Sequence, residues 1–204
     1  MQLSRIYPIT DAQLSGFSHA EQVRLLSLGG ASLIQLREKR LPPLEFYHQA
    51  KSAITENPGV QLIINDRIDI ALAVGAAGVH LGQDDVPPEA ARKLLGPRAV
   101  IGYSTHNIEQ AISAIKLPID YLAIGPIFST TTKADTAPVL GLEGLRAIRQ
   151  AVGQFPLVAI GGITHANARD VIAAGADSVA VISALLSQPD ITTATQNLLA
   201  ACQT

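Results

Sequence analysis

Cationic side chains follow an amide side chain where one apolar run of the sequence ends. In SLIQLREKR, Gln35, Arg37 and Lys39 alternate along an expected strand, so they face one side of it and Glu38 faces the other. Two cations on one side favour an anionic ligand, and the guanidinium fork of Arg suits phosphate oxygens. A solvated strand end with a surface ion pair is the alternative interpretation.

Carboxylates end two further apolar runs and balance these cations. Asp66 follows the run QLIIN, and Asp85 ends GVHLGQDD, with Asp84 beside it as a rival. Mg²⁺ is commonly held by one or two carboxylates together with substrate phosphates and waters. A metal between Asp66 and Asp85 would bridge to a diphosphate bound by the cations, to which Lys133 adds a third charge. The alternative is that each Asp caps a following helix.

A second anion site is predicted in the last third of the chain. The stretch AIGGITHAN permits close backbone approach at Gly161 and Gly162, and VISAL offers backbone N–H groups near Ile182 and Ser183. A plain tight turn at the glycine pair is the alternative. The sequence therefore predicts two phosphorylated ligands, one bound with a metal and one without.

The histidines offer one weak candidate for a catalytic base, His106, which follows Ser104 beyond an expected strand. His80 lies between two apolar residues of another strand and is predicted to be a core or supporting residue. Three others are predicted to be surface or capping residues: His19, His48 and His165. The sequence contains no HExxH motif, Walker loop, GxGxxG or nucleophile elbow, so no covalent intermediate is expected.

The composition excludes several classes of protein. The chain has 204 residues, of which 48% are hydrophobic, as in a globular domain with a large core. A net charge of −2 gives no reason to expect binding to nucleic acid or to an anionic membrane. The single cysteine, Cys202, fits a reducing compartment and is predicted to pack in a last helix. No signal peptide or membrane-length apolar run is apparent, so we expect a cytoplasmic protein.

Short apolar runs recur along the chain and are typical of strands that are covered on both faces. We expect strands over residues 5–10, 32–38, 61–66, 78–83, 99–104, 121–126, 156–162 and 178–183. Helical spacing lies between them, as in residues 18–30 with Ser18 as N-cap, 69–78, 107–116, and 164–176 beginning at Thr164. Eight strands alternating with about eight helices predict an α/β fold, a (β/α)8 TIM barrel that forms one domain over residues 1–204. An open doubly wound sheet is the alternative fold.

A barrel of this kind carries its functional residues at the C-terminal ends of the strands and in the loops that follow. The polar residues named above fall there, as do Asn65, at the end of the third strand, and Ser104, at the end of the fifth. The longest loop, FSTTTKADTAPVLG, follows the sixth strand and contains Thr130, Thr131, Thr132 and Lys133. The polar residues therefore gather at one predicted rim.

With these motifs in this order, the chain resembles the thiamine-phosphate synthase family. The similarity lies in an ordered set of stretches: YPITD, QLREK, IINDRIDIAL, GVHLGQDD, IGYSTH, DYLAIGPIFSTTTK, VAIGGI and GADSVAVIS. The resemblance implies a TIM-barrel transferase that joins 4-amino-5-hydroxymethyl-2-methylpyrimidine diphosphate to a thiazole phosphate. The products implied are thiamine monophosphate and diphosphate, with Mg²⁺ assisting a dissociative substitution.

The resemblance also implies roles for individual residues. Arg37, Lys39, Ser104 and Lys133 would be catalytic, and Asp66 and Asp85 would hold Mg²⁺. The implied substrate-binding residues are these four together with Gln35, Leu36, Glu38, Asn65, Thr130, Thr131, Thr132, Gly162, Ile182 and Ser183. Small molecules are thus the expected partners. The sequence leaves open the oligomeric state, the preference between carboxylated and decarboxylated thiazole phosphate, and the role of His106.

Two other functions remain as alternatives. A thiazole tautomerase of the same fold would need a base, for which His106 is the candidate, and would need neither a diphosphate site nor a metal. A non-catalytic barrel that binds thiamine precursors would explain the fold without turnover. An unrelated phosphate-binding barrel would leave the paired cation and carboxylate clusters unexplained.

Overall fold

Eight parallel strands lie at the centre of the molecule in the computed structural model, which describes residues 3–130 and 138–203. They are β1 (Ile6–Pro8), β2 (Leu33–Leu36), β3 (Gln61–Asn65), β4 (Gly78–Leu81), β5 (Val100–Thr105), β6 (Tyr121–Ile124), β7 (Leu157–Ile160) and β8 (Ser178–Val181). All eight expected strands are therefore present. Each is shorter than the apolar run that predicted it, except β5, because the last residues of the runs turn into the loops.

The sheet closes on itself between its first two strands. The hydrogen-bonded order is β1-β8-β7-β6-β5-β4-β3-β2, which leaves β1 and β2 at the two ends. A parallel bridge between Ile9 and Gln35 joins them, and the Thr10 N–H donates to the Gln35 carbonyl over 2.8 Å. The predicted TIM barrel is confirmed, and the open doubly wound alternative is excluded.

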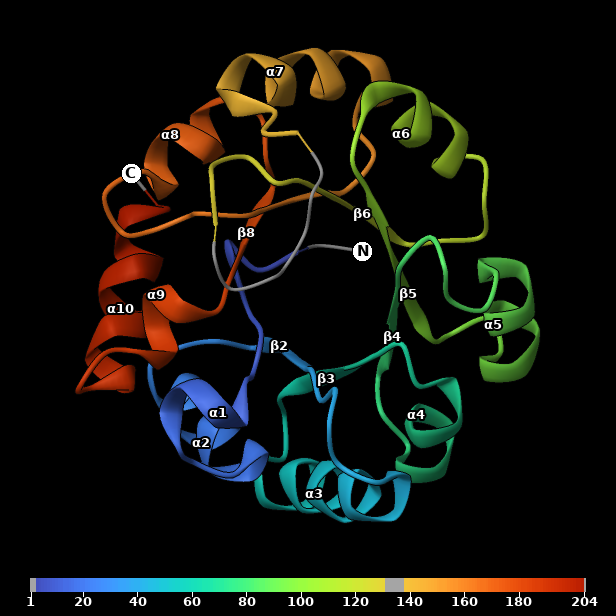
Figure 1. Cartoon of the computed structure of the whole chain (residues 1–204), viewed down its shortest axis with the longest axis vertical. Helices are drawn as coiled ribbons and strands as arrows, with labels where there is room; N and C mark the ends of the chain where they lie inside the picture. The colour runs from blue at the N-terminus through green and yellow to red at the C-terminus, as the bar shows by residue number, and fades with distance from the viewer. Residues whose placement is uncertain (1–2, 131–137, 204) are drawn as a thin grey trace.

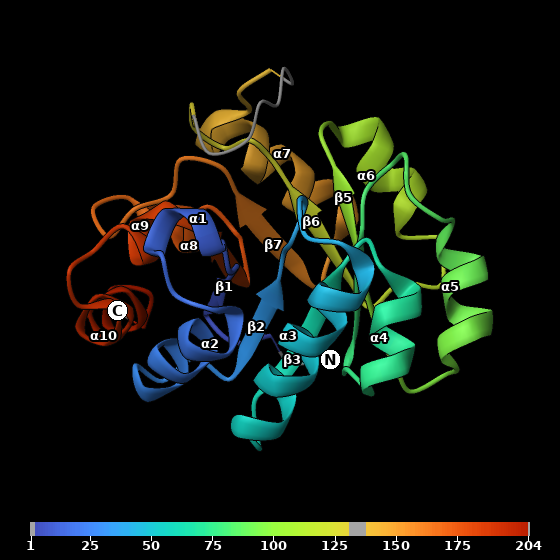
Figure 2. The same cartoon turned by 60° about the horizontal axis from the view of Figure 1, so that its bottom comes forward.

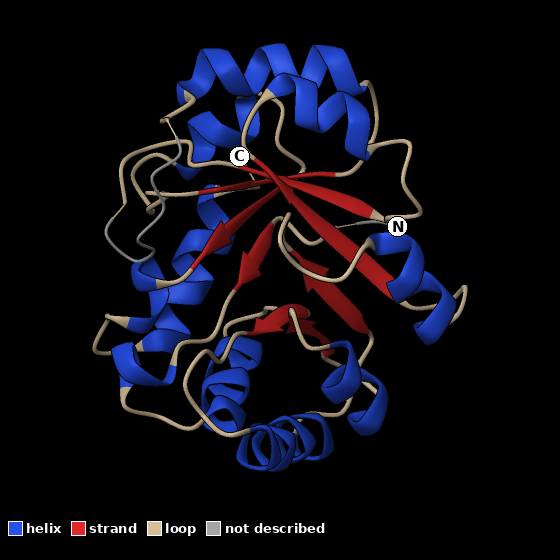
Figure 3. Cartoon of the chain, turned by 45° about the vertical axis from the view of Figure 1, so that its right-hand side comes forward, coloured by secondary structure: helices blue, strands red, loops and turns tan. Residues whose placement is uncertain are grey.

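Helices surround the strands on all sides (Figures 1 and 3). The described residues form α1 (Ala12–Ser15), α2 (His19–Leu28), α3 (Pro43–Glu56), α4 (Ile68–Val74), α5 (Pro88–Leu95), α6 (Ile108–Ala114), α7 (Gly141–Val152), α8 (Ala168–Ala173), α9 (Ser183–Leu186) and α10 (Ile191–Ala201). The short helices α1 and α9 add to the expected number. They contact each other because they follow the paired strands β1 and β8 (Figure 2).

One of the two predicted helix starts is confirmed, and the other is wrong. Ser18 caps α2, and its side chain accepts a hydrogen bond from the Glu21 N–H. Thr164 was expected to begin a helix, but α8 begins at Ala168, because residues 164–167 form a turn. In this turn the Asn167 side chain accepts the Thr164 N–H at 2.8 Å and donates to the Gly162 carbonyl at 3.1 Å. Cys202 follows α10 and is buried, as predicted.

Two tyrosines, one from β1 and one from β6, fill part of the barrel interior. Tyr7 and Tyr121 are fully buried, and their rings meet edge to face with centroids 5.7 Å apart. Gly102 on β5 makes room for this pair, since a Cβ at that position would lie 2.0 Å from the Tyr121 ring. The interior is thus a packed core, as in other barrels of this kind.

Two matching arginine clusters lie at the N-terminal ends of the strands, opposite the rim at which the predicted site residues lie. Arg92, on α5, donates to the Asp120 carboxylate at 2.6 Å and to the carbonyls of Gly96, Ala99 and Pro118. Arg149, on α7, donates to the Asp177 carboxylate at 2.6 Å and to the carbonyls of Gly153, Phe155 and Gly175. Each Arg precedes its Asp by 28 residues, so the same device recurs in successive quarters of the barrel.

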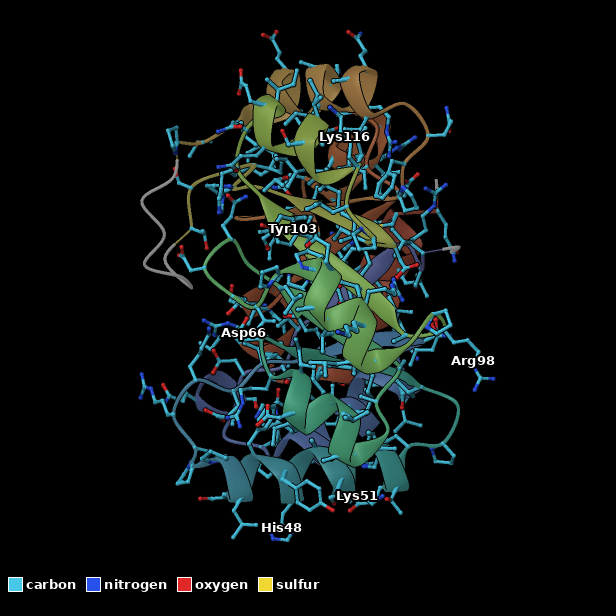
Figure 4. The ribbon with its side chains drawn as sticks, turned by 90° about the vertical axis from the view of Figure 1, so that its right-hand side faces the viewer. His48, Lys51, Asp66, Arg98, Tyr103 and Lys116 are labelled. Carbon is cyan, nitrogen blue, oxygen red and sulfur yellow. The ribbon has the colours of Figure 1, made fainter. Side chains whose placement is uncertain are left out.

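In both clusters the carboxylate also anchors the strand that precedes it in the sheet. Asp120 accepts the Ile101 N–H at 2.8 Å, and Asp177 accepts the Leu157 N–H at 2.9 Å. These contacts lie where β5 and β7 begin, whereas the predicted site residues lie where strands end. Figure 4 shows this separation, with Asp66 and Arg98 on opposite edges of the molecule.

We expect Arg92→Ala and Arg149→Ala each to lower the free energy of unfolding by about 2–3 kcal/mol, since each leaves a carboxylate and several carbonyls without their charged donor. Urea denaturation of the two variants measures this loss. The exposed Arg98→Ala variant is the control and should unfold like the parent protein. A loss below about 0.5 kcal/mol in both cluster variants would show that these contacts do not stabilise the barrel.

Candidate active site

Five of the predicted residues lie along one half of the rim. Gln35 is on β2, Asn65 ends β3, Asp66 follows it, Asp85 follows β4, and Ser104 is on β5. These four strands are consecutive neighbours in the sheet. Because parallel strands end at the same edge, the barrel brings these residues to one surface.

Arg37 and Lys39 lie in the loop after β2 and not on the strand itself. The strand ends at Leu36, so the alternation that was expected through Lys39 is not realised. Arg37 lies 3.9 Å from the Asp11 carboxylate, whereas the Lys39 ammonium pairs with Asp66. A depression of about 460 Å³ lies between residues 11–14 and residues 37–40. The two cations therefore flank an open polar hollow at the rim.

Glu38 shapes the loop that carries these cations. Its Oε1 accepts the backbone N–H groups of Lys39 and Arg40 at 2.7 Å each and of Leu41 at 3.2 Å. Its Oε2 lies 3.3 Å from Nε2 of His19. Burial opposes ionisation of Glu38, but these N–H groups and His19 lower its pKa below the usual value. Leu36, also predicted to bind substrate, has a fully buried side chain, so only its backbone can reach a ligand.

The prediction that His19 is a surface or capping residue is wrong. Its side chain is fully buried beneath the loop after β2, where Nδ1 lies 2.7 Å from the Thr10 hydroxyl. Burial lowers the pKa of His19, although Glu38 and Asp11 favour its charged form. The periodicity of α2 carried the missed signal, because His19, Gln22, Val23 and Leu26 occupy one helix face and all are buried. His48 and His165 are exposed, as predicted.

A continuous hydrogen-bond chain crosses the barrel interior from Gln35 to Ser104. The Gln35 amide donates to the Tyr7 hydroxyl at 3.1 Å, and the Tyr7 and Tyr121 hydroxyls lie 2.8 Å apart. The Tyr121 hydroxyl lies 2.9 Å from Nδ1 of His80, and Nε2 of His80 lies 2.8 Å from the Ser104 hydroxyl. His80 is thus a buried supporting residue, as predicted. The tyrosines were missed, although a hydroxyl on a buried strand needs a partner and was a usable signal.

The two predicted metal ligands lie side by side. Burial raises the pKa of Asp85, and the nearby Asp66 carboxylate raises it further. The Asp85 carboxylate accepts the Gly82 N–H at 2.6 Å, whereas Asp84 is exposed. Neither Asp66 nor Asp85 caps a helix, because α4 and α5 are preceded by Arg67 and Pro87. Asp66 also has a φ of 60°, an uncommon conformation outside glycine.

The described residues hold no group of three or more His, Cys, Asp or Glu side chains that could bind a metal. Any cation at Asp66 and Asp85 would therefore need further ligands from substrate or water. Such sharing is ordinary for Mg²⁺, which usually keeps waters and takes substrate phosphates.

A cavity of about 110 Å³ occupies the other half of the rim. It is lined by residues at the ends of β5 to β8 and in the loops that follow them, among them Ser104, His106, Thr130, Gly162, Ile182 and Ser183. Nδ1 of His106 lies 2.8 Å from the Gly125 carbonyl. Ser104 belongs to this cavity and also to the buried chain from Gln35, so the two halves of the rim meet there. Three predicted residues lie outside the described residues: Thr131, Thr132 and Lys133.

The backbone at Gly162 forms part of the cavity wall, and no larger residue fits at this position. Its φ is +62°, and a Cβ would lie 2.6 Å from the Ser129 carbonyl oxygen and 2.7 Å from Cβ of Phe128. The glycine therefore lets the loops after β6 and β7 touch through their backbones.

The helices of the described residues include none with the length and apolar character that a membrane-spanning helix needs.

The chain matches the family model described as thiamine monophosphate synthase over residues 6–185. It is 49% identical to a thiamine-phosphate synthase of Chloroflexus aurantiacus, covering 96% of this chain and 91% of that protein. It is 50% identical to a thiamine-phosphate synthase of Methanoregula boonei, covering 95% of this chain and 90% of that protein. A solved structure, thiamine phosphate pyrophosphorylase from Pyrococcus furiosus, superimposes with a TM-score of 0.89 at 40% identity, covering 98% of this chain and 96% of that one.

Stability should fall on mild acidification because His19 is buried in its neutral form. The pKa of His19 lies below 6.5 in the folded protein, so the unfolded chain binds more protons as the pH falls below that value. We expect the free energy of unfolding to decrease between about pH 7 and pH 5.5, and His19→Gln to remove much of this decrease. Urea denaturation at several pH values measures both, and equal pH dependence in the two proteins would contradict the expectation.

Proposed function

The chain belongs to the thiamine monophosphate synthase family, and we propose on that basis how the two halves of its rim divide the reaction. It is a transferase of thiamine biosynthesis that joins 4-amino-5-hydroxymethyl-2-methylpyrimidine diphosphate to a thiazole phosphate and releases diphosphate. In the proposed arrangement the half formed by β2 to β5 binds the pyrimidine diphosphate. The cavity after β5 to β8 binds the thiazole phosphate.

The diphosphate binds to the cations of the first half. Arg37 and Lys39 flank the open hollow there, and Lys133, which lies outside the described residues, is the third cation assigned to the diphosphate from the sequence. Arg offers paired donors to phosphate oxygens, and Lys offers a compact charge. Before substrate binds, Arg37 pairs with Asp11 and Lys39 pairs with Asp66. These ion pairs keep the Arg37 and Lys39 side chains directed to the rim.

Mg²⁺ is held by Asp66 and Asp85, and this donor set fits the ion. Burial and, to a smaller extent, the nearby Asp66 carboxylate raise the pKa of Asp85, so a divalent cation bound to the two carboxylates would favour their charged forms. When bound, the ion supplies positive charge to the departing diphosphate. Lys39, paired with Asp66, lies beside this position and can exchange the carboxylate for a phosphate oxygen.

Gln35, Asn65 and Ser104 bind the pyrimidine. One direction of donation uses every group in the buried chain: Gln35 donates to Tyr7, Tyr7 to Tyr121, Tyr121 to Nδ1 of His80, and Nε2–H of His80 to Ser104. The Ser104 hydroxyl proton is then left to donate to the ring. Burial raises the pKa of both tyrosines, which keeps their protons in place.

The thiazole phosphate occupies the second half. Backbone N–H groups at Gly162, Ile182 and Ser183 bind its phosphate, and Thr130, which lines the cavity, contacts its ring. Thr131 and Thr132 lie outside the described residues and are assigned to this substrate from the sequence alone. Glu38 contributes by setting the shape of the loop after β2. Leu36 contributes through its backbone, since its side chain is buried.

The step that needs most assistance is the departure of the diphosphate. The bond between the pyrimidine methylene carbon and the diphosphate oxygen breaks, and its electron pair leaves with the diphosphate. Arg37, Lys39 and Lys133 stabilise the charge that builds there. The thiazole nitrogen then donates its lone pair to the methylene carbon and forms the new C–N bond. The observation that carries this assignment is the meeting of the cationic half and the phosphate cavity at Ser104.

The test is formation of thiamine monophosphate from the two substrates, with Mg²⁺ and with EDTA. We expect product only with the metal, and we expect Asp66→Asn and Asp85→Asn to lose it, while the exposed neighbour variant Asp84→Asn keeps it. Arg37→Ala should lower kcat/KM by about 100-fold with little change in Tm. Equal losses in the Asp84 and Asp85 variants, or a loss of Tm that matches the loss of activity, would defeat these assignments.

We expect Gly162→Ala to raise the KM for the thiazole phosphate by at least about tenfold, because the added Cβ collides with the loop after β6. The KM for the pyrimidine diphosphate should stay unchanged, as measured by steady-state kinetics. Gly153→Ala is the matched control, since its φ of +63° is nearly the same but no atom lies within 4 Å of its added Cβ. Equal kinetic effects in the two variants would mean that backbone strain alone is responsible.

A further inference from the structure

A buried cluster outside the substrate-facing residues supports the cationic loop from below. It consists of His19 on α2, Thr10 after β1, and Glu38 in the loop itself, and the first two are fully buried. The ring of His19 lies 2.7 Å from the Thr10 hydroxyl through Nδ1 and 3.3 Å from the Glu38 carboxylate through Nε2. The cluster thus joins three elements that are separate in the sequence.

The hydrogen bonds of this cluster have one consistent direction. The Thr10 oxygen accepts the backbone N–H of Arg37 at 3.2 Å, so its own proton is available for Nδ1 of His19. Nδ1 is then an acceptor, and the ring proton lies on Nε2, where it is donated to the Glu38 carboxylate. A neutral His19 therefore satisfies all three groups without an additional charge in the core.

The two ends of this chain fix the backbone on either side of the loop. Thr10 holds the backbone N–H of Arg37, while Glu38 holds the N–H groups of Lys39, Arg40 and Leu41. The directions in which the Arg37 and Lys39 side chains leave the backbone depend on these four N–H contacts. His19 is the only group described in the structure that bonds to both Thr10 and Glu38.

We propose that His19 is a positioning residue for diphosphate binding: it sets the loop that presents Arg37 and Lys39 without touching the substrate itself. This inference rests on the proposed function, because it assumes that these two cations bind the diphosphate. The expected consequence is selective, since the thiazole cavity is built on β5 to β8 and shares no residue with the cluster.

The experiment compares three replacements of His19. His19→Phe keeps a flat ring against Phe46, whose centroid lies 5.9 Å from that of His19, but it neither donates nor accepts. His19→Gln keeps an N–H donor for Glu38, and His19→Asn keeps an acceptor for Thr10. We expect His19→Phe to raise the KM for the pyrimidine diphosphate about tenfold, with the KM for the thiazole phosphate unchanged. His19→Gln should restore most of the affinity, and the inhibition constant of inorganic pyrophosphate should follow the same order.

Two controls separate positioning from general loss of stability. Arg92→Ala weakens the opposite end of the barrel and should lower Tm without a difference between the two KM values. His48→Phe changes an exposed histidine of α3 and should alter neither (Figure 4). If His19→Phe does not fold, Thr10→Val breaks the same chain at its Thr10 end and should produce the same selective rise.

The outcomes distinguish this inference from the proposed function. A raised KM for the pyrimidine diphosphate in Arg37→Ala together with an unchanged KM in His19→Phe overturns the positioning role and leaves the proposed function intact. An equal rise in both KM values of His19→Phe also overturns it, since that result indicates general distortion. Unchanged KM values in Arg37→Ala and His19→Phe overturn both assignments.

Discussion

Closure of the barrel between β1 and β2 is the constraint on which the site depends. Among the described residues, this seam is joined by one bridge, from Ile9 to Gln35, and by the hydrogen bond from Thr10 to Gln35. The other neighbouring strands share three or four paired positions. The seam with the least backbone pairing is therefore the one that carries the cationic loop. Side chains add contacts across this seam: the Gln35 amide donates to the Tyr7 hydroxyl, and the Thr10 hydroxyl oxygen accepts the backbone N–H of Arg37.

A chain of polar side chains inside an apolar barrel destabilises the fold unless every member is hydrogen-bonded. A buried hydroxyl or imidazole without a partner loses its hydrogen bonds to water and gains none in return. The chain from Gln35 to Ser104 meets this condition along its whole length. Its benefit is orientation. The side chains at both ends are already fixed, so in the proposed function substrate binding would not have to order them.

The sequence predicts the strands and the rim well because both follow from simple patterns. Apolar runs mark buried strands, and a closed parallel barrel places whatever follows them at one edge. The direction of individual side chains is harder. Arg37 and Lys39 depart from strand alternation because β2 ends at Leu36, and no local pattern marks that end. His19 was misplaced because a polar residue at a helix start usually caps it, whereas here the helix face that it shares packs inward.

The two halves of the rim are also supported in different ways, and this difference follows from the fold. The half proposed to bind the thiazole phosphate stands on β5 to β8, whose N-terminal ends are fixed by the repeated Arg92 and Arg149 clusters, and its wall depends on the backbone at Gly162. The half proposed to bind the diphosphate includes the loop at the closing seam, and this loop is held at the rim by side chains such as Glu38 and His19. Backbone walls suit a substrate that must only be held, whereas side-chain cations can follow a charge that grows during the reaction. In the proposed function the division of support therefore matches the division of chemistry, because the leaving diphosphate would develop charge and the thiazole phosphate would not.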